Sequence, residues 1–387
     1  MKRIGVWRNF DWVLFAALAA LSLIGVLFIW STNLPTAGSA FPAAALRRQI
    51  MWLTISAALF FALLFVDYRV FRHLAYPAYI VALVALLALF VLGTTTRNTR
   101  RWFDIAGILS VQPSEFTKLA LVLALGRHLM FRGSIRTIRG LLVPAALTFV
   151  PVLLILRQPD LATAALLPVA LIAMLLAVGA NARHLAALLA AACAALVLVL
   201  FACYRYDAKT IADKAGIIEP YQVERIQAFL KPDSHPDRSY QYRQSVLAIG
   251  SGGLWGKGWG QGTQNRLNFL PERPTDFIFA VIGEERGFLG SAVALALFLV
   301  IILRAMAIAK RTREPLGRLL VVGVASVLAA QIFINAAMTV GLVPISGVTL
   351  PLVSYGGSSL LATFLGLSLI MNVGMRRVTV LASEDFA

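Results

Sequence analysis

The chain has 387 residues, of which 59% are hydrophobic and 14% charged, and its mean hydropathy is +0.81. Soluble domains carry about a quarter charged residues, so this composition excludes an ordinary soluble enzyme and indicates a membrane protein. The formal net charge of +17 would also suit a nucleic-acid-binding protein. The basic residues instead gather in loops on one side of the predicted topology, so we expect no nucleic-acid partner.

Apolar runs close to the length that crosses a bilayer recur along the chain. We interpret these runs as membrane-spanning helices: 11–30, 48–66, 75–93, 115–131, 140–156, 161–179, 182–203, 277–303, 317–341 and 355–375. The fourth run is the most polar, and the fifth and sixth form a tight hairpin around Pro159. The predicted fold class is an all-α integral membrane protein of about ten transmembrane helices, with residues 1–387 as a single polytopic domain.

The distribution of lysine and arginine predicts the orientation. An even number of spans places both termini on one side of the membrane, and the loops on that side contain most of the basic residues outside the long loop. The short loops opposite contain only Arg47, Arg48, Arg97, Arg100, Arg101 and Arg157. The positive-inside rule therefore predicts cytoplasmic termini. The long loop between spans seven and eight, about 204–276, is then extracytoplasmic.

This outer loop has apolar anchors that a linker would lack: Phe229, Leu230, Trp255, Trp259, Phe269 and Leu270. Helical spacing over Pro220–Leu230 predicts an amphipathic helix on the membrane surface. Its basic residues, Arg225 among them, suit an anionic headgroup or a pyrophosphate; a solvated loop against lipid is the alternative. The glycine-rich stretches 250–253 and 256–260 follow no strand, which favours a close-packed loop over a phosphate-binding one.

Metal and disulfide signals are weak. Cys193 and Cys203 lie in or at the end of the seventh span and predict no disulfide framework. The four histidines lie in separate loops or span ends, without the spacing of a zinc site.

The densest polar stretch, 269–279, places Glu272, Arg273 and Asp276 where the outer loop enters an apolar span. A carboxylate at this boundary is costly unless something uses or compensates its charge. Asp276 directly precedes a helix, so a simple N-cap is one interpretation. The other is a general base that accepts a proton from a sugar hydroxyl.

Other polar residues have a structural and a functional interpretation as well. Glu115 and Lys118 could be a self-satisfying ion pair, Asp160 a helix cap, and Arg101 with Trp102 part of an aromatic belt. Asn335 is expected to bond another helix. In the predicted topology a set of polar residues shares the outer span ends, which favours one outward-facing polar cavity: Trp102, Glu115, Lys118, Asp160, Asp276, Ser354, Tyr355, Gly356, Gly357 and Ser358.

The order of several motifs resembles the SEDS family (shape, elongation, division and sporulation proteins), with the form of its RodA-type members. The motifs are Arg101-Trp102, Gln112-Pro113-Ser114-Glu115, Gln158-Pro159-Asp160-Leu161-Ala162-Thr163, 248–254, Gly256-Lys257-Gly258, 269–279 and 351–358. The chain departs from the family pattern at Pro274, where a histidine is usual, and at Ala162, where a glycine is usual.

The resemblance implies a peptidoglycan glycosyltransferase that polymerises lipid II during cell elongation and releases undecaprenyl pyrophosphate. It implies that Asp276 is catalytic, that a class B penicillin-binding protein of the PBP2 type and the elongation machinery are partners, and that the location is the bacterial inner membrane. Because an α-linked donor gives a β-linked product, one base suffices. The expected cations at the pyrophosphate are Lys118, Arg101 or Arg225, or a bound Mg²⁺ or Mn²⁺; Glu272 would orient a cation.

Three alternatives stay open from the residues alone. A lipid-linked precursor flippase would also need many spans and intramembrane charges. A division-type polymerase would share the same motifs. A non-enzymatic scaffold for cell-wall partners would make Asp276 a cap.

Overall fold

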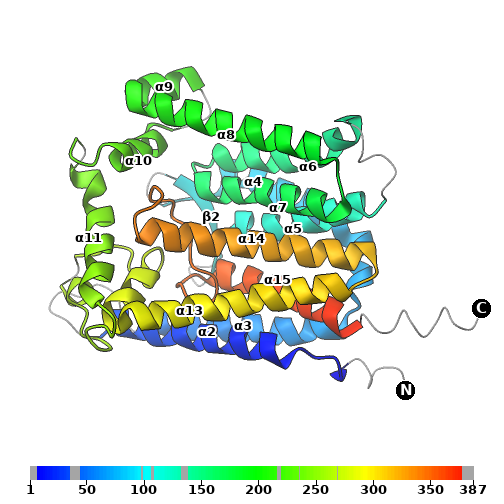
Figure 1. Cartoon of the computed structure of the whole chain (residues 1–387), viewed down its shortest axis with the longest axis horizontal. Helices are drawn as coiled ribbons and strands as arrows, with labels where there is room; N and C mark the ends of the chain where they lie inside the picture. The colour runs from blue at the N-terminus through cyan, green and yellow to red at the C-terminus, as the bar shows by residue number, and fades with distance from the viewer. Residues whose placement is uncertain are drawn as a thin grey trace, which may run out of the picture.

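The computed structural model describes residues 7–34, 44–96, 99–105, 109–131, 138–215, 219–234, 236–267 and 269–376. Long helices run side by side through the molecule (Figure 1). The helices are α2 (Trp12–Thr32), α3 (Ala44–Phe65), η1 (Tyr68–Val70), α4 (Phe71–Leu92), α5 (Pro113–Leu129), α6 (Ile138–Leu156), α7 (Leu161–Val178), α8 (Ala182–Arg205), α9 (Ala208–Ala215), α10 (Pro220–Leu230), α11 (Pro236–Gly252), α12 (Thr263–Arg266), α13 (Ile278–Arg311), α14 (Pro315–Thr339) and α15 (Gly357–Arg376).

Each of the predicted spans corresponds to one long helix, and the helix ends lie within a few residues of the expected ones except at α13, which continues to Arg311 rather than ending at 303. Within the described residues, eight of these helices are long and apolar enough to cross a membrane. The exceptions are α5 and α6, which correspond to the predicted fourth and fifth spans. The chain is therefore a multi-pass, largely helical membrane protein, while the exact number of spans stays a prediction.

The centre of the bundle explains why the fourth predicted span is polar. Most residues of α5, α14 and α15 are buried, and both α14 and α15 pack against α5. Because α5 faces protein along most of its length, it does not need the uniformly apolar surface of a lipid-facing helix. By contrast α8 lies at the edge of the bundle and is exposed over nearly its whole length (Figure 1).

The two ends of the bundle differ. α2 begins and α15 ends at the same end, and α9, α10 and α11 lie at the other (Figure 1). We name the second end the loop end. This arrangement agrees with termini on one side and the long loop on the opposite side; which side is cytoplasmic stays a prediction.

A small antiparallel sheet between α4 and α5 adds to the predicted all-helical architecture. Its strands are β1 (Thr94–Thr96), β2 (Thr99–Ile105) and β3 (Leu109–Val111), in the order β1-β2-β3, with Trp102 opposite Thr94 and Phe103 opposite Val111. Threonine and aromatic residues favour strands. β1 and β3, with three residues each, are too short to give a periodic signal, and β2, TRRWFDI, lacks the alternation of apolar and polar residues.

The outer loop is folded rather than extended. The predicted surface helix is α10, with the expected bounds, and the Glu219 N–H donates to the Gln222 side chain at its start over 3.0 Å. α11 packs against α13. The loop therefore forms a helical cover at the loop end of the bundle.

The helix α13 breaks at Gly287, which has φ +65° and ψ −159°. The glycine-rich loop fills the break: the N–H groups of Phe288 and Leu289 donate to the carbonyls of residues 253 and 254, and the carbonyls of residues 284 and 285 accept from Lys257 and Gly258. A Cβ on Gly287 would lie 2.4 Å from the Gly256 nitrogen. Backbone groups freed inside an apolar region need such partners. Gly252 and Gly256 are close-packed against α13, as expected, whereas a Cβ on Gly250 or Gly253 would meet nothing within 4 Å.

We predict that Gly25→Ala destabilises the bundle, because a Cβ at this position of α2 would lie 2.7 Å from the Leu352 carbonyl oxygen and 2.8 Å from the Val353 Cα. Overpacking against backbone costs about 1–3 kcal/mol. Thermal unfolding of the purified protein in detergent measures the effect. Gly250→Ala is the matched control, since a Cβ at this position in the last turn of α11 meets nothing within 4 Å; equal unfolding temperatures for the two variants would contradict the prediction.

Candidate functional site

Asp276 lies in a tight turn directly before α13. The carbonyl of Glu272 accepts the N–H groups of Thr275, Asp276 and Phe277, over 3.1–3.3 Å, and Glu272 itself has φ +56°. The N-cap position of α13 is occupied by Phe277, which makes no side-chain cap bond. The simple N-cap interpretation of Asp276 is therefore not supported by the helix start, and the half-buried carboxylate needs another explanation.

This turn is attached to the bundle through three consecutive backbone carbonyls. Tyr355 N–H donates to the carbonyl of residue 274 over 2.7 Å, Ser354 Oγ to that of 275 over 2.5 Å, and Asn335 Nδ2 to that of 276 over 2.9 Å. The donors come from α14 and from the loop before α15. The position of Asp276 is thus set through its backbone by the central helices.

The loop before α15, which bonds this turn, also contains a non-glycine residue with positive φ. Leu352, two residues before Ser354, has φ +65°. A non-glycine residue in the left-handed region is uncommon and costs about 1–3 kcal/mol, so it persists where its surroundings hold it. Two such residues, Glu272 and Leu352, therefore flank the junction that carries Asp276.

Arg225 of α10 and the Asp276 carboxylate both lie close to Gly347. A Cβ placed on Gly347 would lie 3.7 Å from both Arg225 Nη1 and Asp276 Oδ2, so both groups border the small gap left by this glycine. The guanidinium also donates to the Tyr221 hydroxyl over 2.5 Å and lies 4.7 Å from the centre of its ring. The outer loop thus places a cation beside the candidate base.

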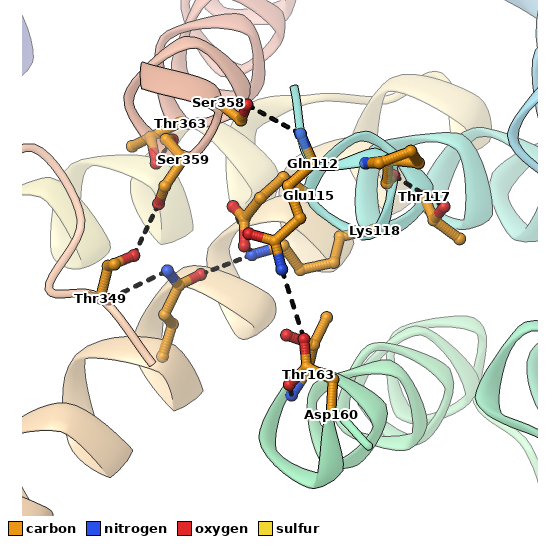
Figure 2. Close-up of polar contacts among 12 residues, drawn as sticks. Gln112, Glu115, Thr117, Lys118, Asp160, Thr163, Thr349, Ser358, Ser359 and Thr363 are labelled. Carbon is orange, nitrogen blue, oxygen red and sulfur yellow. Dashed lines mark hydrogen bonds and ion pairs between the residues drawn. The ribbon is translucent and has the colours of Figure 1, made fainter. Parts of the chain in front are cut away.

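A second polar group lies deeper, between α5 and α14 (Figure 2). Lys118 Nζ is 2.9 Å from Glu115 Oε2 and donates to Gln331 Oε1 over 2.9 Å, and the exposed fractions of Lys118 and Glu115 are 4% and 6%. Gln331 Nε2 in turn donates to the Thr349 carbonyl over 3.1 Å. The predicted ion pair therefore exists, and it is buried in protein rather than facing lipid.

Asp160 caps α7 and also bonds Gln112, which directly precedes α5, the helix of Glu115 and Lys118. Its side chain accepts from the Thr163 N–H at the start of α7 over 3.2 Å and from Gln112 Nε2 over 3.4 Å (Figure 2). Arg101 in β2 donates to the carbonyls of Gln158 and Pro159, and Trp102 beside it is half-buried. The strand and the short hairpin before α7 are thus joined next to Asp160.

The segment Ser354–Ser358 joins several helices at the loop end. Gly356 N–H lies 3.4 Å from Gln49 Oε1, and Ser358 Oγ accepts from the Gln112 N–H over 3.0 Å. A Cβ on Gly357 would lie 2.1 Å from the Trp52 ring, so the absent side chain permits close packing. Whether these five residues also contact a substrate stays a prediction.

Asn335 and Gln331 connect the two polar groups, because they lie one turn apart on the same face of α14. Asn335 Nδ2 donates to the carbonyls of residues 348 and 276, and Gln331 to that of 349. Asn335 was expected to bond a helix and instead bonds loop carbonyls. Gln331 was missed, although a polar residue inside an apolar span is itself a signal.

The cavity beside Lys118 is small. It lies between α5, α14 and α15, has a volume of about 30 Å³ and is lined mainly by apolar side chains such as Val122, Val324 and Leu328. This volume holds about one or two water molecules. It therefore accommodates no sugar in this conformation.

The described residues contain no group of three or more histidine, cysteine, aspartate or glutamate side chains that could hold a metal ion. Burial lowers the pKa of Arg273, which lies three residues before Asp276. Arg273 was not among the predicted site residues, and its guanidinium bonds the carbonyls of Asn265 and Thr32.

Comparison with known proteins identifies the family. Residues 11–378 match the family model described as cell cycle protein, which covers FtsW, RodA and SpoVE. The chain is 34% identical over 370 residues to the peptidoglycan glycosyltransferase MrdB of Escherichia coli strain K12, covering 95% of this chain and 94% of the relative. It is 33% identical over 376 residues to the probable peptidoglycan glycosyltransferase FtsW of Geobacter sulfurreducens, covering 95% and 96%.

Solved structures agree. RodA of Thermus thermophilus has a TM-score of 0.68 at 30% identity, covering 96% of this chain and 98% of that one. A chain from a structure described as a peptidoglycan synthase complex that coordinates polymerization and crosslinking has a TM-score of 0.78 at 32% identity, covering 95% and 98%. From the family match over residues 11–378, the common fold and the shared sequence, the chain belongs to the SEDS family of FtsW, RodA and SpoVE proteins.

Proposed function

We propose that this chain is an inverting peptidoglycan glycosyltransferase that polymerises lipid II, with Asp276 as its general base. Relatives that share about a third of its residues over nearly its whole length are named peptidoglycan glycosyltransferases. These names favour an enzyme over a flippase or a scaffold. The observation that carries the assignment of the base is the placement of Asp276, half-buried before α13 and held through its backbone by the central helices.

The proposed reaction needs one displacement. The Asp276 carboxylate accepts the proton of the acceptor 4-hydroxyl as the hydroxyl oxygen bonds to the anomeric carbon of the donor sugar. The bond from that carbon to the pyrophosphate breaks, and undecaprenyl pyrophosphate leaves. One displacement converts the α-linkage to a β-linkage without a covalent intermediate.

The leaving pyrophosphate requires positive charge. Arg225 is the best-placed cation because it borders the same gap as the Asp276 carboxylate. Lys118 is bound to Glu115 and Gln331 deeper in the bundle, and Arg101 is bound to the hairpin before α7. In our proposal Lys118 and Arg101 stabilise the helices and the hairpin that surround the site, and they do not contact the pyrophosphate in this conformation.

We also propose that a divalent cation, Mg²⁺ or Mn²⁺, binds between the protein and the phosphates of the substrate. Mg²⁺ is typically bound by one or two carboxylates together with substrate phosphates. Asp276 and Glu272, both in the turn before α13, are the carboxylates that would hold such an ion together with the substrate phosphates. When bound, the ion would neutralise charge on the leaving group.

We infer an elongation-type role in the bacterial inner membrane from the RodA-type motifs, although relatives named MrdB and FtsW are almost equally similar. The related synthase complex is described as coordinating polymerization and crosslinking. We therefore propose a crosslinking partner, a class B penicillin-binding protein of the PBP2 type, for this chain as well.

The first prediction of this proposal is that Asp276→Asn abolishes polymerisation while the protein stays folded. Removing a general base costs about 10²–10⁴ in rate. Product chains formed from lipid II and separated on a gel measure the activity. Asp233→Asn, which changes an exposed carboxylate of the outer loop, is the control and should keep full activity; normal chains from Asp276→Asn would reject the base assignment.

The second prediction separates charge from stability at Lys118. Breaking a buried ion pair by removing one partner costs about 3–5 kcal/mol, whereas replacing both partners with apolar residues is often neutral. Lys118→Met should therefore lower the unfolding temperature, and Lys118→Met with Glu115→Leu should restore it. If the double variant also recovers lipid II turnover, the pair is structural; turnover that stays low would assign the charges a direct role.

The third prediction concerns the partner. If the outer loop is ordered by a membrane-proximal partner domain, lipid II turnover should rise when a PBP2-type protein is added, because a fixed loop keeps Arg225 beside Asp276. Co-purification from detergent and turnover with and without the partner measure both effects. Unchanged turnover in the co-purified complex would contradict activation.

A further inference from the structure

Two neighbouring carboxylates, Glu284 and Glu285, are buried in α13 just before its break, with exposed fractions of 1% and 0%. A buried charge in an apolar region is costly unless specific donors compensate it. The two side chains have different donors. Glu284 accepts from Lys257 Nζ over 2.7 Å, Thr263 Oγ1 over 2.9 Å and the Gln264 N–H over 3.0 Å.

Glu285 joins three separate segments. Its carboxylate accepts from Ser31 Oγ at the end of α2 over 2.6 and 2.8 Å, from Asn265 Nδ2 in α12 over 2.9 Å, and from the Gly260 N–H in the glycine-rich loop over 3.0 Å. These donors are all neutral. The carboxylate therefore acts as a common acceptor that holds the loop against α2.

Arg273 binds two of the same segments from the other side. Its exposed fraction is 4%, and its guanidinium donates to the carbonyl of Asn265 over 2.5 Å and to that of Thr32 over 3.2 Å. Asn265 is thus held by its side chain to Glu285 and by its backbone to Arg273. At the end of α2, the Ser31 side chain donates to Glu285 and the backbone carbonyl of the adjacent Thr32 accepts from Arg273.

Arg273 is also the second residue of the turn that carries Asp276, because the turn begins at Glu272 and its carbonyl bonds close over residues 275–277. A displacement of Asn265 or of the end of α2 would therefore move the turn. The break at Gly287 separates residues 278–286 from the rest of α13, so this short helical segment needs anchors of its own. Glu285 is its anchor to α2 and α12.

We propose that Glu285 is a positioning residue for Asp276, acting through Asn265 and Arg273. This inference rests on the proposed function and deepens it. Glu285 does not touch the reacting groups; it keeps the base where the acceptor hydroxyl meets it. A misplacement of about 1 Å in an active site can lower the rate by about 10²-fold, and the loss falls on kcat rather than on substrate binding.

The test uses the full-length protein, purified with its crosslinking partner, and measures kcat and KM for lipid II together with the unfolding temperature. Glu285→Leu removes the acceptor, and we expect kcat to fall by about 10²-fold with an unchanged KM. Glu285→Gln keeps the volume of the side chain and faces an amide N–H₂ toward the Gly260 or Ser31 donors. Glu285→Gln replaces the leucine variant in the test if Glu285→Leu does not fold. We expect kcat of Glu285→Gln to fall by about tenfold. A wild-type kcat in Glu285→Gln overturns the proposal.

Three further variants make the test specific. Arg273→Met should lower kcat in the same way, and Glu285→Leu combined with Arg273→Met should lose no more than the worse single variant, because contacts in one network are not additive. Multiplied losses would reject the shared route. Glu284→Gln is the matched control, equally buried but bonded to neither Asn265 nor Ser31; a loss as large as that of Glu285→Gln would reject a distinct role for Glu285.

The outcomes also separate this inference from the proposed function. If Asp276→Asn is inactive and the Glu285 variants keep full kcat, the positioning role is wrong and the base assignment stands. If Asp276→Asn is active in the same assay, the base assignment is wrong and the positioning role loses its target.

Discussion

The attachment of residues 274–276 to the central helices is the interaction on which the candidate site depends. Three successive carbonyls accept bonds from Asn335, Ser354 and the Tyr355 N–H. Backbone bonds leave side chains available for chemistry while they restrict the position of the chain. A carboxylate at the boundary of an apolar bundle thereby obtains a defined position through the backbone of its own turn.

Protein groups also compensate the charged side chains in the rest of the polar interior. Lys118 is paired with Glu115, Glu284 with Lys257, and Glu285 is surrounded by neutral donors. The broken α13 has its freed backbone groups bound by the glycine-rich loop. Charges and irregular backbone in the interior of the bundle are tolerated where protein satisfies them, so the fold depends on the compensating residues as much as on the charged ones.

The helices could be predicted because apolar periodicity and length are local properties, and α10 followed from the spacing of its apolar residues. The sheet at Trp102 could not, since β1 and β3 have only three residues each and β2, Thr99–Ile105, does not alternate apolar with polar residues. The pairing of Glu115 with Lys118 followed from their spacing on one helix. The bonds of Ser354 to residue 275 and of Arg273 to Thr32 join positions far apart in the chain, and no local pattern contains them.

Glu272 and Leu352, with φ of +56° and +65°, have a consequence for engineering. Glycine or asparagine fits this backbone region more easily than either native residue, so a screen that rewards thermostability alone would favour replacing them. Such replacements relieve strain in the two loops that hold the base, and stability gained at strained sites is often offset by lost function. Thermostabilised versions raised for structural work should therefore retain both residues and draw their substitutions from the lipid-facing surface of peripheral helices such as α8.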